Sequence, residues 1–593
     1  MKYQIIKDLE EYLTKAFGSS TKPQIGVERT PTEFDGDITV NCFRLAPHFK
    51  VSPMDIAEKA GEFCEGHDDA IQVQTIKAFV NITLDSTRLF QEAVGDEKAI
   101  LDDCRLAEEE RRKIVVEFSA PNTNKPQHLG HVRNNSLGQV IGSLFEKIGH
   151  DVAPVNLIND RGIHICKSML AYQRWGQGST PESTGMKGDH FVGDFYVKYQ
   201  EVFKKQVEEL RESRPDLAEK EDEELSLETE IGQAAQQMLI DWESGDPDVL
   251  SLWKTMNQWV IEGFRQTYKR MGVEFDRVYL ESETYGKGRE IINERLSEGI
   301  FREREDGAVV IDLDEEKLGT KVVLRSDGTS VYVTQDIGTT VIKQEDYTPD
   351  YQVWVVGDEQ IFHFKVLFAI LKRLGYSWAD NLQHLPYGMV NLPSGKMKSR
   401  EGTVVDADDL FDELAQLARK ATLDRYDTCP DDIDHRAEVI GMSAIKFMLL
   451  SVNAQTAMTF DPEASVKFEG DTGPYVLYAC ARISSMLKKA EKQNVRAEPH
   501  WSALGTEEEK ELALLCAQYG ETVRRAAAEL NPSLVTGFLL QLAKSFSRFY
   551  RECPVLTAPS PEMCQARLAL SKRVHTVLKD GLETLTIQPL ESM

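Results

Sequence analysis

Two histidines, His128 and His131, flank a Leu-Gly pair in the stretch IVVEFSAPNTNKPQHLGHVRNNSLG, which covers residues 114–138. Residues 114–118 are short, apolar and β-rich, as expected of a buried parallel strand. Apolar residues then recur at helical spacing, which predicts a helix that begins near Gly130. The two histidines therefore stand where a strand gives way to a helix.

A helix N-terminus in this position favours phosphate, because its free N–H groups and its dipole point toward the anion. Both imidazoles can donate to phosphate oxygens, and Gly130 has no Cβ, so a flat base can lie against the backbone. Such a site would hold a nucleotide without a GxxxxGK[ST] loop, which the chain lacks. The alternatives are two unrelated helical histidines or a metal pair. A zinc site is disfavoured because the sequence contains neither H-E-x-x-H nor C-x-x-C.

A glycine-flanked basic loop, GKMKSREG, occupies residues 395–402. Its lysines, Lys396 and Lys398, could neutralise the outer phosphates of a nucleotide and the charge on departing pyrophosphate. Taken alone, the loop is more typical of ordinary surface charge, but its place after the HLGH helix start in an α/β domain favours a phosphate-binding role. Two more segments are candidates for loops at strand ends: residues 324–336, with a turn at Asp327-Gly328 before a β-rich run, and residues 351–360, a strand that ends in GDEQ.

The elements that must position these residues fall into three parts, since 593 residues exceed the size of a single core. We predict an α/β Rossmann-like domain over residues 111–407, with a helical insertion near 175–260. A small α+β domain precedes it at 1–110, and an all-α helical bundle follows at 408–593, where β-rich runs nearly vanish. Residues 201–230 hold 12 acidic and five basic residues, which indicates an exposed helical insertion or simply solvated surface.

The formal net charge of −28 argues against indiscriminate nucleic-acid binding, although a shaped RNA could still meet local basic patches. One such patch lies between residues 541 and 576, and a solvated helix face is the alternative explanation. Nine scattered cysteines fit unpaired thiols in a reducing cytosol. The sequence lacks an apolar run of membrane-spanning length and a signal-peptide core, so we expect a cytoplasmic protein with no membrane partner.

The HLGH segment closely resembles the HIGH signature of class I aminoacyl-tRNA synthetases, and its flanks are similar to the arginyl-tRNA synthetase family. The basic loop resembles the KMSKS signature in its KMSxRxG form, but Lys398 replaces a small residue and Ser399 stands where the second lysine is expected. Lys125 matches the position of a substitute lysine in other members. Further similar segments cover nearly the whole chain: GDHFVGDFYVKY (188–199), RSDGTSVYVTQD (325–336), FEGDTGPYVLYACAR (468–482) and FSRFYRECPVL (546–556).

The resemblance implies that arginine is activated with ATP and transferred to the 3′-terminal adenosine of tRNA(Arg), and that activation needs tRNA. Positioning and electrostatic stabilisation suffice for such chemistry. His128 and His131 would act on the phosphates, Gly130 on the adenine, and Lys396 with Lys125 on the β- and γ-phosphates. Magnesium would accompany ATP, held mainly by phosphate oxygens and water, with no metal or organic cofactor bound by the protein itself. We expect a monomer.

A guanidinium with five donors requires carboxylates and a phenol in a fixed plane. The resemblance assigns arginine binding to Glu117, Asn122, Tyr332, Asp336 and Gln360, with His363 as a further possible contact. Tyr332 and Asp336 lie four residues apart, so an irregular or helical turn must start near Thr334 for both to face one ligand. The alternatives are an ion pair of Glu117 with Arg133 or Lys125, and a helix N-cap role for Asp336.

The resemblance also implies two tRNA-binding regions. FDGD (34–37) and AFVNI (78–82) look like the family's additional domain at the tRNA elbow, with Phe79 and Asn81 as contacts, although Ala78 replaces the usual glycine. Burial of Phe79 in a small core is the alternative. The helical part would grip the anticodon arm by basic residues and stacking. Its candidates, of which many also suit helix packing, are Tyr475, Tyr478, Arg548, Phe549 and Tyr550.

Two rival functions remain at this point. A free-standing nucleotidyltransferase of the H-x-G-H type would not need a large helical domain or the FEGDTGPY segment. A catalytically inactive RNA-binding paralogue would not need an intact HLGH, Lys396 or Asp336, although Ser399 departs from the signature. A synthetase explains all of these features together.

Overall fold

The computed structural model describes residues 3–593 except 32, 218, 394–404 and 425–429. The chain divides into two compact units. Unit 1 comprises Met1–Arg105, Lys467–Glu529 and Ser533–Met593, and unit 2 comprises Leu106–Val466 with Leu530–Pro532.

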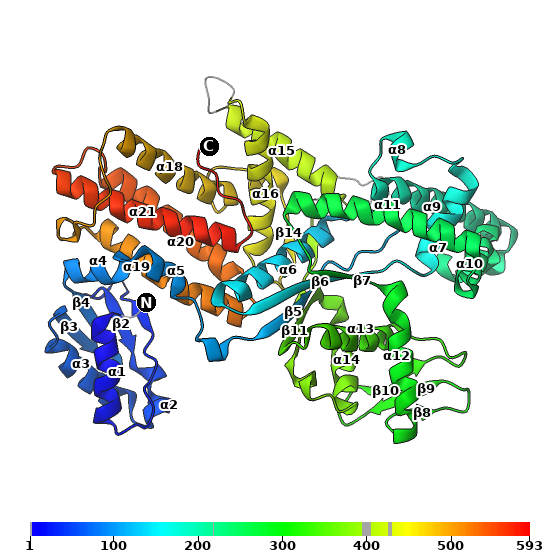
Figure 1. The fold of residues 1–593 in the computed structure, drawn as a ribbon, viewed down its shortest axis with the longest axis horizontal. Helices are drawn as coiled ribbons and strands as arrows, with labels where there is room; N and C mark the ends of the chain where they lie inside the picture. The colour runs from blue at the N-terminus through cyan, green and yellow to red at the C-terminus, as the bar shows by residue number, and fades with distance from the viewer. Residues whose placement is uncertain (1–2, 32, 218, 394–404, 425–429) are drawn as a thin grey trace. The chain divides into compact units, whose positions relative to one another are not determined.

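Unit 2 is built on a parallel sheet with strand order β12-β11-β5-β6-β7 (Figure 1). Counted along the chain, this is the 3-2-1-4-5 order of a Rossmann-like fold, which confirms the predicted α/β architecture. The order reverses between β5 and β11, and ligands bind beyond the carboxyl ends of the strands at such a switch point. The bounds are β5 Lys113–Glu117, β6 Asp151–Ile158, β7 Arg277–Leu280, β11 Tyr351–Gly357 and β12 Leu382–Tyr387.

Strand β5 reads as a run of apolar residues because it is covered on both faces, with Val115 packed among Ala153, Val155 and Tyr279 of the neighbouring strands. Helix α6 (Leu129–Ile148) follows it and packs closely on the end of the strand. An added Cβ at Gly138 would lie 2.1 Å from Cγ of Phe118, so this approach requires a glycine.

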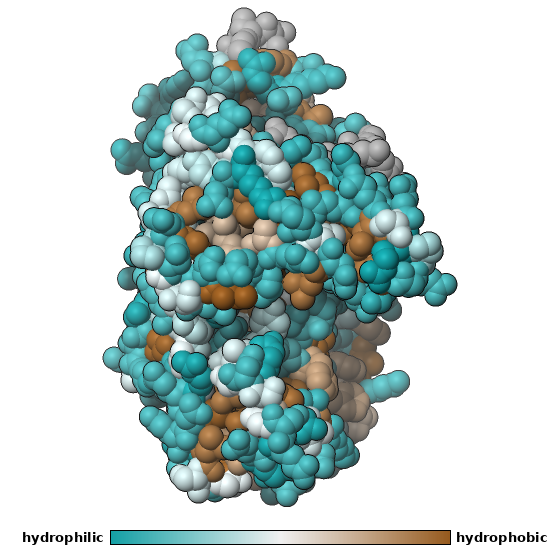
Figure 2. All heavy atoms as spheres, turned by 90° about the vertical axis from the view of Figure 1, so that its right-hand side faces the viewer, coloured by the Kyte–Doolittle hydropathy of each residue, from teal (hydrophilic) through white to brown (hydrophobic). Residues whose placement is uncertain are grey.

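The predicted helical insertion lies between β6 and β7. It contains α7 Ile163–Trp175, α8 Pro181–Thr184, α9 Gly188–Ser213, α10 Glu230–Ser244 and α11 Pro247–Met271, with 3-10 turns at Pro215–Leu217 and Asp222–Glu228 in its acidic stretch. Figure 2 looks onto the side of the molecule at the right of Figure 1, and most of that face is hydrophilic, with apolar side chains in small scattered areas.

A three-stranded antiparallel sheet, order β10-β9-β8, follows helix α12. The prediction of a β-rich run after the Asp327-Gly328 turn is wrong, because helix α13 begins there at Tyr332. Its β-branched residues Val333 and Thr334 are buried, and the Thr334 hydroxyl donates to the carbonyl of Val323, so tertiary packing overrides local β-propensity. The bounds are α12 Glu281–Arg295, β8 Arg302–Glu303, β9 Val309–Leu313, β10 Gly319–Leu324, α13 Tyr332–Tyr347 and α14 Ile361–Arg373.

The first helices of the predicted C-terminal part cluster with the parallel sheet in unit 2. They are α15 Ala407–Leu423, α16 Ile433–Leu450 and α17 Pro462–Ser465, beside the short parallel strands β13 Val390–Asn391 and β14 Met458–Thr459. No helix among the residues that the structure describes is both long enough and apolar enough to cross a membrane.

Unit 1 joins an N-terminal α+β part, with a sheet of order β1-β2-β4-β3, to a bundle of long helices, and this confirms the predicted classes of both. Arg573 of the bundle donates to the carbonyl of Val94 and pairs with Glu97. The bounds are α1 Gln4–Ala16, β1 Val27–Arg29, β2 Ile38–Asn41, α2 Ala46–Phe49, α3 Pro53–Glu65, β3 Ala70–Ile76, β4 Phe79–Leu84, α4 Ser86–Val94, α5 Glu97–Asp102, α18 Gly473–Lys492, α19 Glu507–Ala528, α20 Ser533–Glu552 and α21 Pro561–Thr584.

Candidate active site

The histidine turn, residues 127–131, forms the N-terminus of α6, with His128 as the N-cap in extended conformation. The Nδ1 of His128 accepts from the backbone N–H of Gly130 at 3.1 Å, and the Nδ1 of His131 accepts from the N–H of His128 at 3.2 Å. These bonds place the proton of each neutral ring on Nε2. Each histidine thus keeps one Nε2–H donor for a ligand.

Both imidazoles are neutral at physiological pH. Burial, with the nearby charge of Lys125, lowers the pKa of His128 to about 4. Burial, together with His128 and Lys125, holds the pKa of His131 well below its ordinary value. The turn therefore offers hydrogen-bond donors rather than cations to a phosphate.

The structure requires glycine at position 130 for a reason other than the approach of a base. An added Cβ would lie 2.9 Å from Cε1 and 3.0 Å from Nδ1 of the His128 ring. The two histidine rings are themselves only 4.0 Å apart between centroids. A side chain at Gly130 would therefore displace the His128 ring before any nucleotide arrived.

The histidine turn is fastened to the chain that leads into α15. Leu129 donates its N–H to the carbonyl of Val405, and Ala407 donates to that of Gln127, both at 3.0 Å. His128 and Asp406 form the antiparallel bridge between them. Residues 405–407 thus fix the backbone of the turn.

Arg133, one turn further along α6, is fully buried and donates to backbone carbonyls instead of a carboxylate. Its guanidinium reaches Gly388 at 2.7 Å, Ala454 at 3.0 Å and Thr456 at 2.8 Å. It therefore holds the chain after β12 against the chain before β14. The alternative ion pair between Arg133 and Glu117 does not form.

Glu117, at the end of β5, is buried and paired with Lys343 of α13. The Nζ of Lys343 also lies 4.3 Å from the centroid of the Trp354 ring. The partner of Glu117 is thus neither Arg133 nor Lys125. Its place in the arginine pocket stays a prediction, and Lys343 already neutralises the carboxylate.

Tyr332 and Asp336 lie on one face of α13, because the helix starts at Tyr332, two residues before the turn that we predicted. Asp336 accepts from Nε2 of His363, 2.5 Å away on α14, and Val331 rather than Asp336 is the N-cap. The Tyr332 side chain is 78% exposed. Both side chains are available at one edge of the site.

Glu281 is a candidate that the sequence analysis missed. It begins α12 directly after β7, and its carboxylate is largely removed from water. Burial, with the charges of Asp160 and Asp336 nearby, raises its pKa to about 7, although Arg161 at 4.0 Å works against this. The signal was present as an acidic residue immediately after the short strand RVYL.

The ends of β6 and β7 are held together at this acidic site. The carboxylate of Asp160 accepts from the backbone N–H of Ser282 at 2.9 Å and from its hydroxyl at 2.6 Å. The carbonyl of Asp160 accepts from Trp253 at 2.6 Å and Asn257 at 3.0 Å of the insertion. The insertion therefore fixes the loop beside Glu281.

The remaining predicted residues occupy different settings. Asn122 is exposed and its backbone bridges to Asn159, whereas Gln360 is exposed at the end of the 3-10 turn after β11. Lys125 is half-buried before the histidine turn. Lys396 lies outside the described residues, as do Lys398 and Ser399.

Asp189, His190 and Asp408 come close enough together to suit a metal ion. The ammonium group of Lys187, however, lies 2.9 Å from Asp189 and 2.6 Å from Asp408. A cation of the protein therefore already fills this position, and the group is an ion cluster.

In the N-terminal part of unit 1, Phe79 is half-buried and meets the exposed Phe43 edge-on at 5.7 Å between centroids. Asn81 is only 3% exposed, and its side-chain oxygen accepts from the hydroxyl of Thr39 at 2.7 Å. A direct tRNA contact thus suits Phe79 with Phe43 better than Asn81, whose amide is engaged within the sheet.

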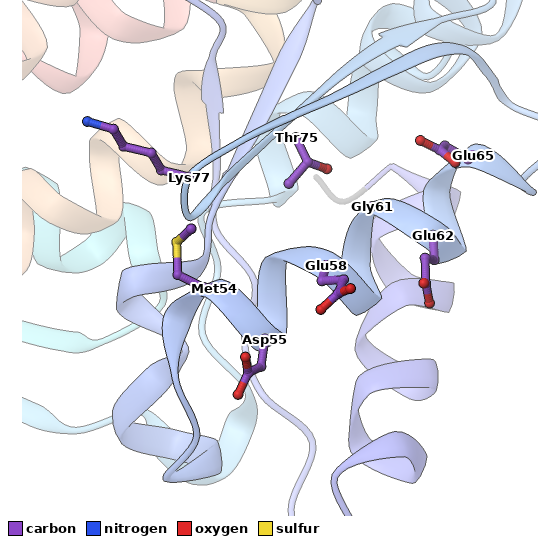
Figure 3. Close-up of a pocket in the computed structure, with 8 residues that line it drawn as sticks. All are labelled: Met54, Asp55, Glu58, Gly61, Glu62, Glu65, Thr75 and Lys77. Atoms are coloured by element: carbon purple, nitrogen blue, oxygen red, sulfur yellow. The ribbon is translucent and has the colours of Figure 1, made fainter.

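Unit 1 has a hollow of about 440 Å³ on helix α3 and strand β3. Figure 3 shows the residues that line it. Acidic side chains dominate its lining, and Lys77 is the one basic residue there. Such a surface repels phosphate, so it suits neither a nucleotide nor an RNA backbone. The carboxylates at the hollow are Asp55, Glu58, Glu62 and Glu65.

On the helices of unit 1, Arg482 lies between two tyrosine rings, 4.6 Å from the centroid of Tyr478 and 5.5 Å from that of Tyr550. Arg548 pairs with Glu511, and the hydroxyl of Tyr475 donates to Ser547 at 3.2 Å. Phe549, in contrast, is fully buried, so its expected stacking on RNA is wrong. Its side chain packs in the core because it lies on the inner face of α20.

Comparison with known proteins gives three family models along the chain. Residues 3–84 match the arginyl tRNA synthetase N terminal domain, residues 97–462 match the catalytic domain of tRNA synthetases class I (R), and residues 476–593 match the DALR anticodon binding domain.

Among curated relatives, the arginine–tRNA ligase of Treponema denticola is 43% identical over 589 residues, covering 96% of this chain and 95% of that protein. The arginine–tRNA ligase of Bacteroides thetaiotaomicron is 41% identical over 574 residues, covering 95% of each. The fold is similar to the solved Thermus thermophilus arginyl-tRNA synthetase, with a TM-score of 0.78, 24% identity and full coverage of both chains.

Proposed function

The chain belongs to the arginyl-tRNA synthetases of class I and is an arginine–tRNA ligase that uses ATP, and from this premise we propose which of its residues carry the reaction. The arginine carboxylate attacks the α-phosphorus of ATP and expels pyrophosphate. A ribose hydroxyl of the terminal adenosine of tRNA(Arg) then attacks the carbonyl carbon of the adenylate and releases AMP. Neither step needs a protein nucleophile, so the residues act by position and charge.

The nucleotide lies at the histidine turn. His128 and His131 present Nε2–H donors to phosphate oxygens as charge develops at the α-phosphate, and being neutral they need no proton exchange. Lys125, whose charge both histidines experience, contacts the outer phosphates together with Lys396. Mg²⁺ is held mainly by the phosphates and water.

The observation that carries the arginine assignment is that α12, which begins with Glu281, packs against α13, which carries Asp336, so that the charge of Asp336 reaches the buried carboxyl of Glu281. A guanidinium bound between the two carboxylates neutralises their charges. Tyr332 lies on the same face of α13 as Asp336, and its side chain contacts the guanidinium from the solvent side. Glu117, Asn122 and Gln360 remain candidates for the other end of arginine.

tRNA binds along unit 1. The stacked group of Tyr478, Arg482 and Tyr550 offers both aromatic faces and a positive charge to unpaired bases, which are the features that single-stranded RNA favours. The exposed Phe43–Phe79 pair is the contact proposed for the tRNA elbow. We infer further that bound tRNA completes the active site, so that amino-acid activation depends on it. The enzyme acts as a monomer in the cytoplasm.

The test is amino-acid-dependent pyrophosphate exchange, measured with each of the twenty amino acids, in the presence and in the absence of total tRNA. Of the twenty, we expect only arginine to support exchange, and only when tRNA is present. Exchange with another amino acid would overturn the assignment of the pocket. Exchange in the absence of any amino acid would favour a small-molecule nucleotidyltransferase, and no exchange under any condition would favour an inactive RNA-binding paralogue.

A further inference from the structure

A cluster of charged residues joins helices α9 and α15 at the back of the histidine turn, and no step proposed above uses it. We propose that this α9–α15 ion cluster (Lys187, Asp189, His190, Asp406 and Asp408) positions the histidine turn for adenylate formation, with Lys187 and His190 as positioning residues. The inference rests on the proposed function, because its activity readout is that reaction.

The cluster is compact and largely buried. Lys187 Nζ lies 2.9 Å from Asp189, 2.6 Å from Asp408 and 2.6 Å from the hydroxyl of Thr267 on α11. His190 Nε2 lies 3.4 Å from the carboxylates of both Asp406 and Asp408. Charges at this depth are tolerated only while they are paired.

Glycines let the buried Asp189 fit between two helices. Helices α9 and α11 lie side by side (Figure 1). A Cβ at Gly263 of α11 would lie 2.4 Å from an oxygen of Asp189, and a Cβ at Gly188 would lie 2.0 Å from the carbonyl of Trp259. The segment GDHFVGDFYVKY, to which the sequence analysis gave no chemical role, thus places the buried charge of Asp189 beside α15.

The cluster is connected to the histidine turn by the backbone. Asp406 caps α15 by accepting from the N–H groups of Asp408 at 2.9 Å and Asp409 at 3.1 Å. Its neighbours Val405 and Ala407 hold Leu129 and Gln127 through the hydrogen bonds described above. A shift of the 405–408 segment therefore moves the backbone that carries His128.

Helix α9 also touches the residues that lead into the turn. A Cβ at Gly193 would lie 2.9 Å from Cδ of Pro126 and 3.7 Å from Cα of Lys125. One helix of the insertion thus meets the turn directly at one point and through Asp406 and Asp408 at a second. These two points of support hold the backbone that carries Lys125 and His128.

The charges of the cluster are complementary. Burial disfavours ionised Asp408, but the nearby His190, 3.4 Å away, and the charge of Lys187 prevail and lower its pKa to about 2. Burial likewise disfavours the His190 cation, yet Asp408, Asp406 and Asp189 together raise its pKa above the ordinary value. Two cations thus face three carboxylates, and removing one cation leaves a buried carboxylate unpaired.

The first experiment compares Lys187→Met and His190→Gln with the wild-type enzyme in tRNA-supported pyrophosphate exchange. We expect kcat to fall at least about tenfold in Lys187→Met while the KM for arginine changes less than about twofold, because the arginine pocket lies on other elements. Arg174→Met is the matched control, since the Arg174–Glu230 pair joins α7 and α10 of the same insertion away from the turn. It should leave kcat unchanged.

The second experiment reads the position of the turn without activity. Amide hydrogen exchange of peptides that contain residues 127–132 should be faster in Lys187→Met than in wild type or Arg174→Met, because the Leu129 N–H loses its fixed acceptor. In the double variant Lys187→Met/Asp189→Asn the carboxylate whose ion-pair partner was Lys187 is gone, so kcat should recover at least about threefold over the single variant.

The pH profile separates His190 from a merely structural residue. His190 is a cation only below its raised pKa, so wild-type exchange should decline above that pKa and the decline should be absent in His190→Gln. The facing groups are Lys187 and Asp189 on α9, Asp406 and Asp408 at α15, and Thr267 on α11.

The proposal is overturned if Lys187→Met keeps wild-type kcat, if its turn exchanges hydrogen at the wild-type rate, or if its KM for arginine rises as much as kcat falls. It is also overturned if Arg174→Met is equally impaired. A failure of the function itself looks different, since the wild-type enzyme would then show no arginine-dependent exchange while the hydrogen-exchange comparison could still be made.

Discussion

At the scale of single residues, the histidine turn depends on hydrogen bonds that orient each ring. His128 and His131 each accept a backbone N–H at Nδ1, and this leaves a single donor, Nε2–H, pointing away from the backbone. The low pKa of His128 means that protonation begins only near pH 4. Since the unfolded chain binds that proton already near the ordinary pKa, His128 makes the fold less stable as pH falls from about 6.5 toward 4.

His128→Asn removes the Nε2–H donor and retains a good N-cap, because asparagine also accepts from the first turn of a helix. We expect the rate of tRNA-supported pyrophosphate exchange to fall about 10²–10³-fold, as for the loss of one donor to developing charge. His128→Ala loses the cap as well and should in addition lower the free energy of unfolding by about 1 kcal/mol. Full exchange by His128→Asn would remove the ring from the chemistry.

Asp336→Asn tests the arginine pocket. Removal of its charge should raise the KM for arginine by about 30-fold, equivalent to about 2 kcal/mol, the lower end of the range for a charge pair because the carboxylate is partly exposed. The KM for ATP should stay unchanged. Asp327→Asn, in the exposed turn before α13, is the matched control and should behave as wild type. If the KM for arginine were the same in Asp336→Asn as in Asp327→Asn, Asp336 would lie outside the pocket.

The raised pKa of Glu281 leads us to expect that arginine binding depends on pH. With a pKa of about 7 in the free enzyme, its carboxyl is mostly protonated at pH 6 and mostly ionised at pH 8. Only the ionised form attracts a guanidinium, so the KM for arginine should be higher at pH 6 than at pH 8. Glu281→Gln should have a raised KM that no longer changes between these values. A wild-type KM that is flat over this range would contradict the role of Glu281.

At the scale of elements, the site depends on how α6 begins and what it is fastened to. Strand β5 ends in Glu117, the connection turns, and the helix starts at the N-cap His128 as expected for a strand–turn–helix unit. Arg133 then ties the helix, through backbone carbonyls, to the chain between β12 and β13 and to the chain just before β14. Secondary structure supplies the donors, but these long-range bonds hold them in place.

Arg133→Met should lower the free energy of unfolding by about 3 kcal/mol, since several buried carbonyls lose a charged donor at once. Arg133→Lys should restore little, because an ammonium group lacks the planar fork that reaches separate carbonyls. Arg174→Met, which breaks a partly exposed pair, should cost less than about 1 kcal/mol. Urea unfolding of the full chain measures all three, and equal midpoints for Arg133→Met and Arg174→Met would contradict this account.

At the scale of the whole molecule, the enzyme is strongly acidic yet must bind an RNA. The net charge of −28 leaves binding to local features, among which we propose the stacked Tyr478–Arg482–Tyr550 group on the helices of unit 1. The acidic hollow of Figure 3 shows that another face of unit 1 is unsuited to phosphate. Recognition therefore depends on shape and a few charges rather than on an overall positive field.

Arginine-dependent exchange should be almost absent in rigorously RNA-free buffer and restored by total tRNA. Raising the salt concentration should weaken the restoration, because phosphate contacts release counterions on binding. An unstructured RNA of equal length is the control and should not restore exchange. Brisk exchange by the RNA-free enzyme would contradict tRNA dependence and leave the ligase function intact.

The amino-acid sequence alone determined the elements whose pattern is local. The strand at residues 114–118, the helix that starts at the histidines, and the change from mixed to helical structure all follow from periodicity and turn residues over short windows. The pattern failed at Val333 and Thr334, where β-branched residues lie in the first turn of a helix because their burial against β10 outweighs β-propensity.

Only the tertiary structure decided which charges meet. Glu117 pairs with Lys343, 226 residues away, and Lys187 pairs with Asp408, 221 residues away. The charge of Asp336 reaches Glu281 because helices α12 and α13 pack against each other. No local pattern contains these partners, since strand order and helix packing are set by the burial of apolar faces over the whole unit, and the charged side chains then pair with whatever that packing places beside them.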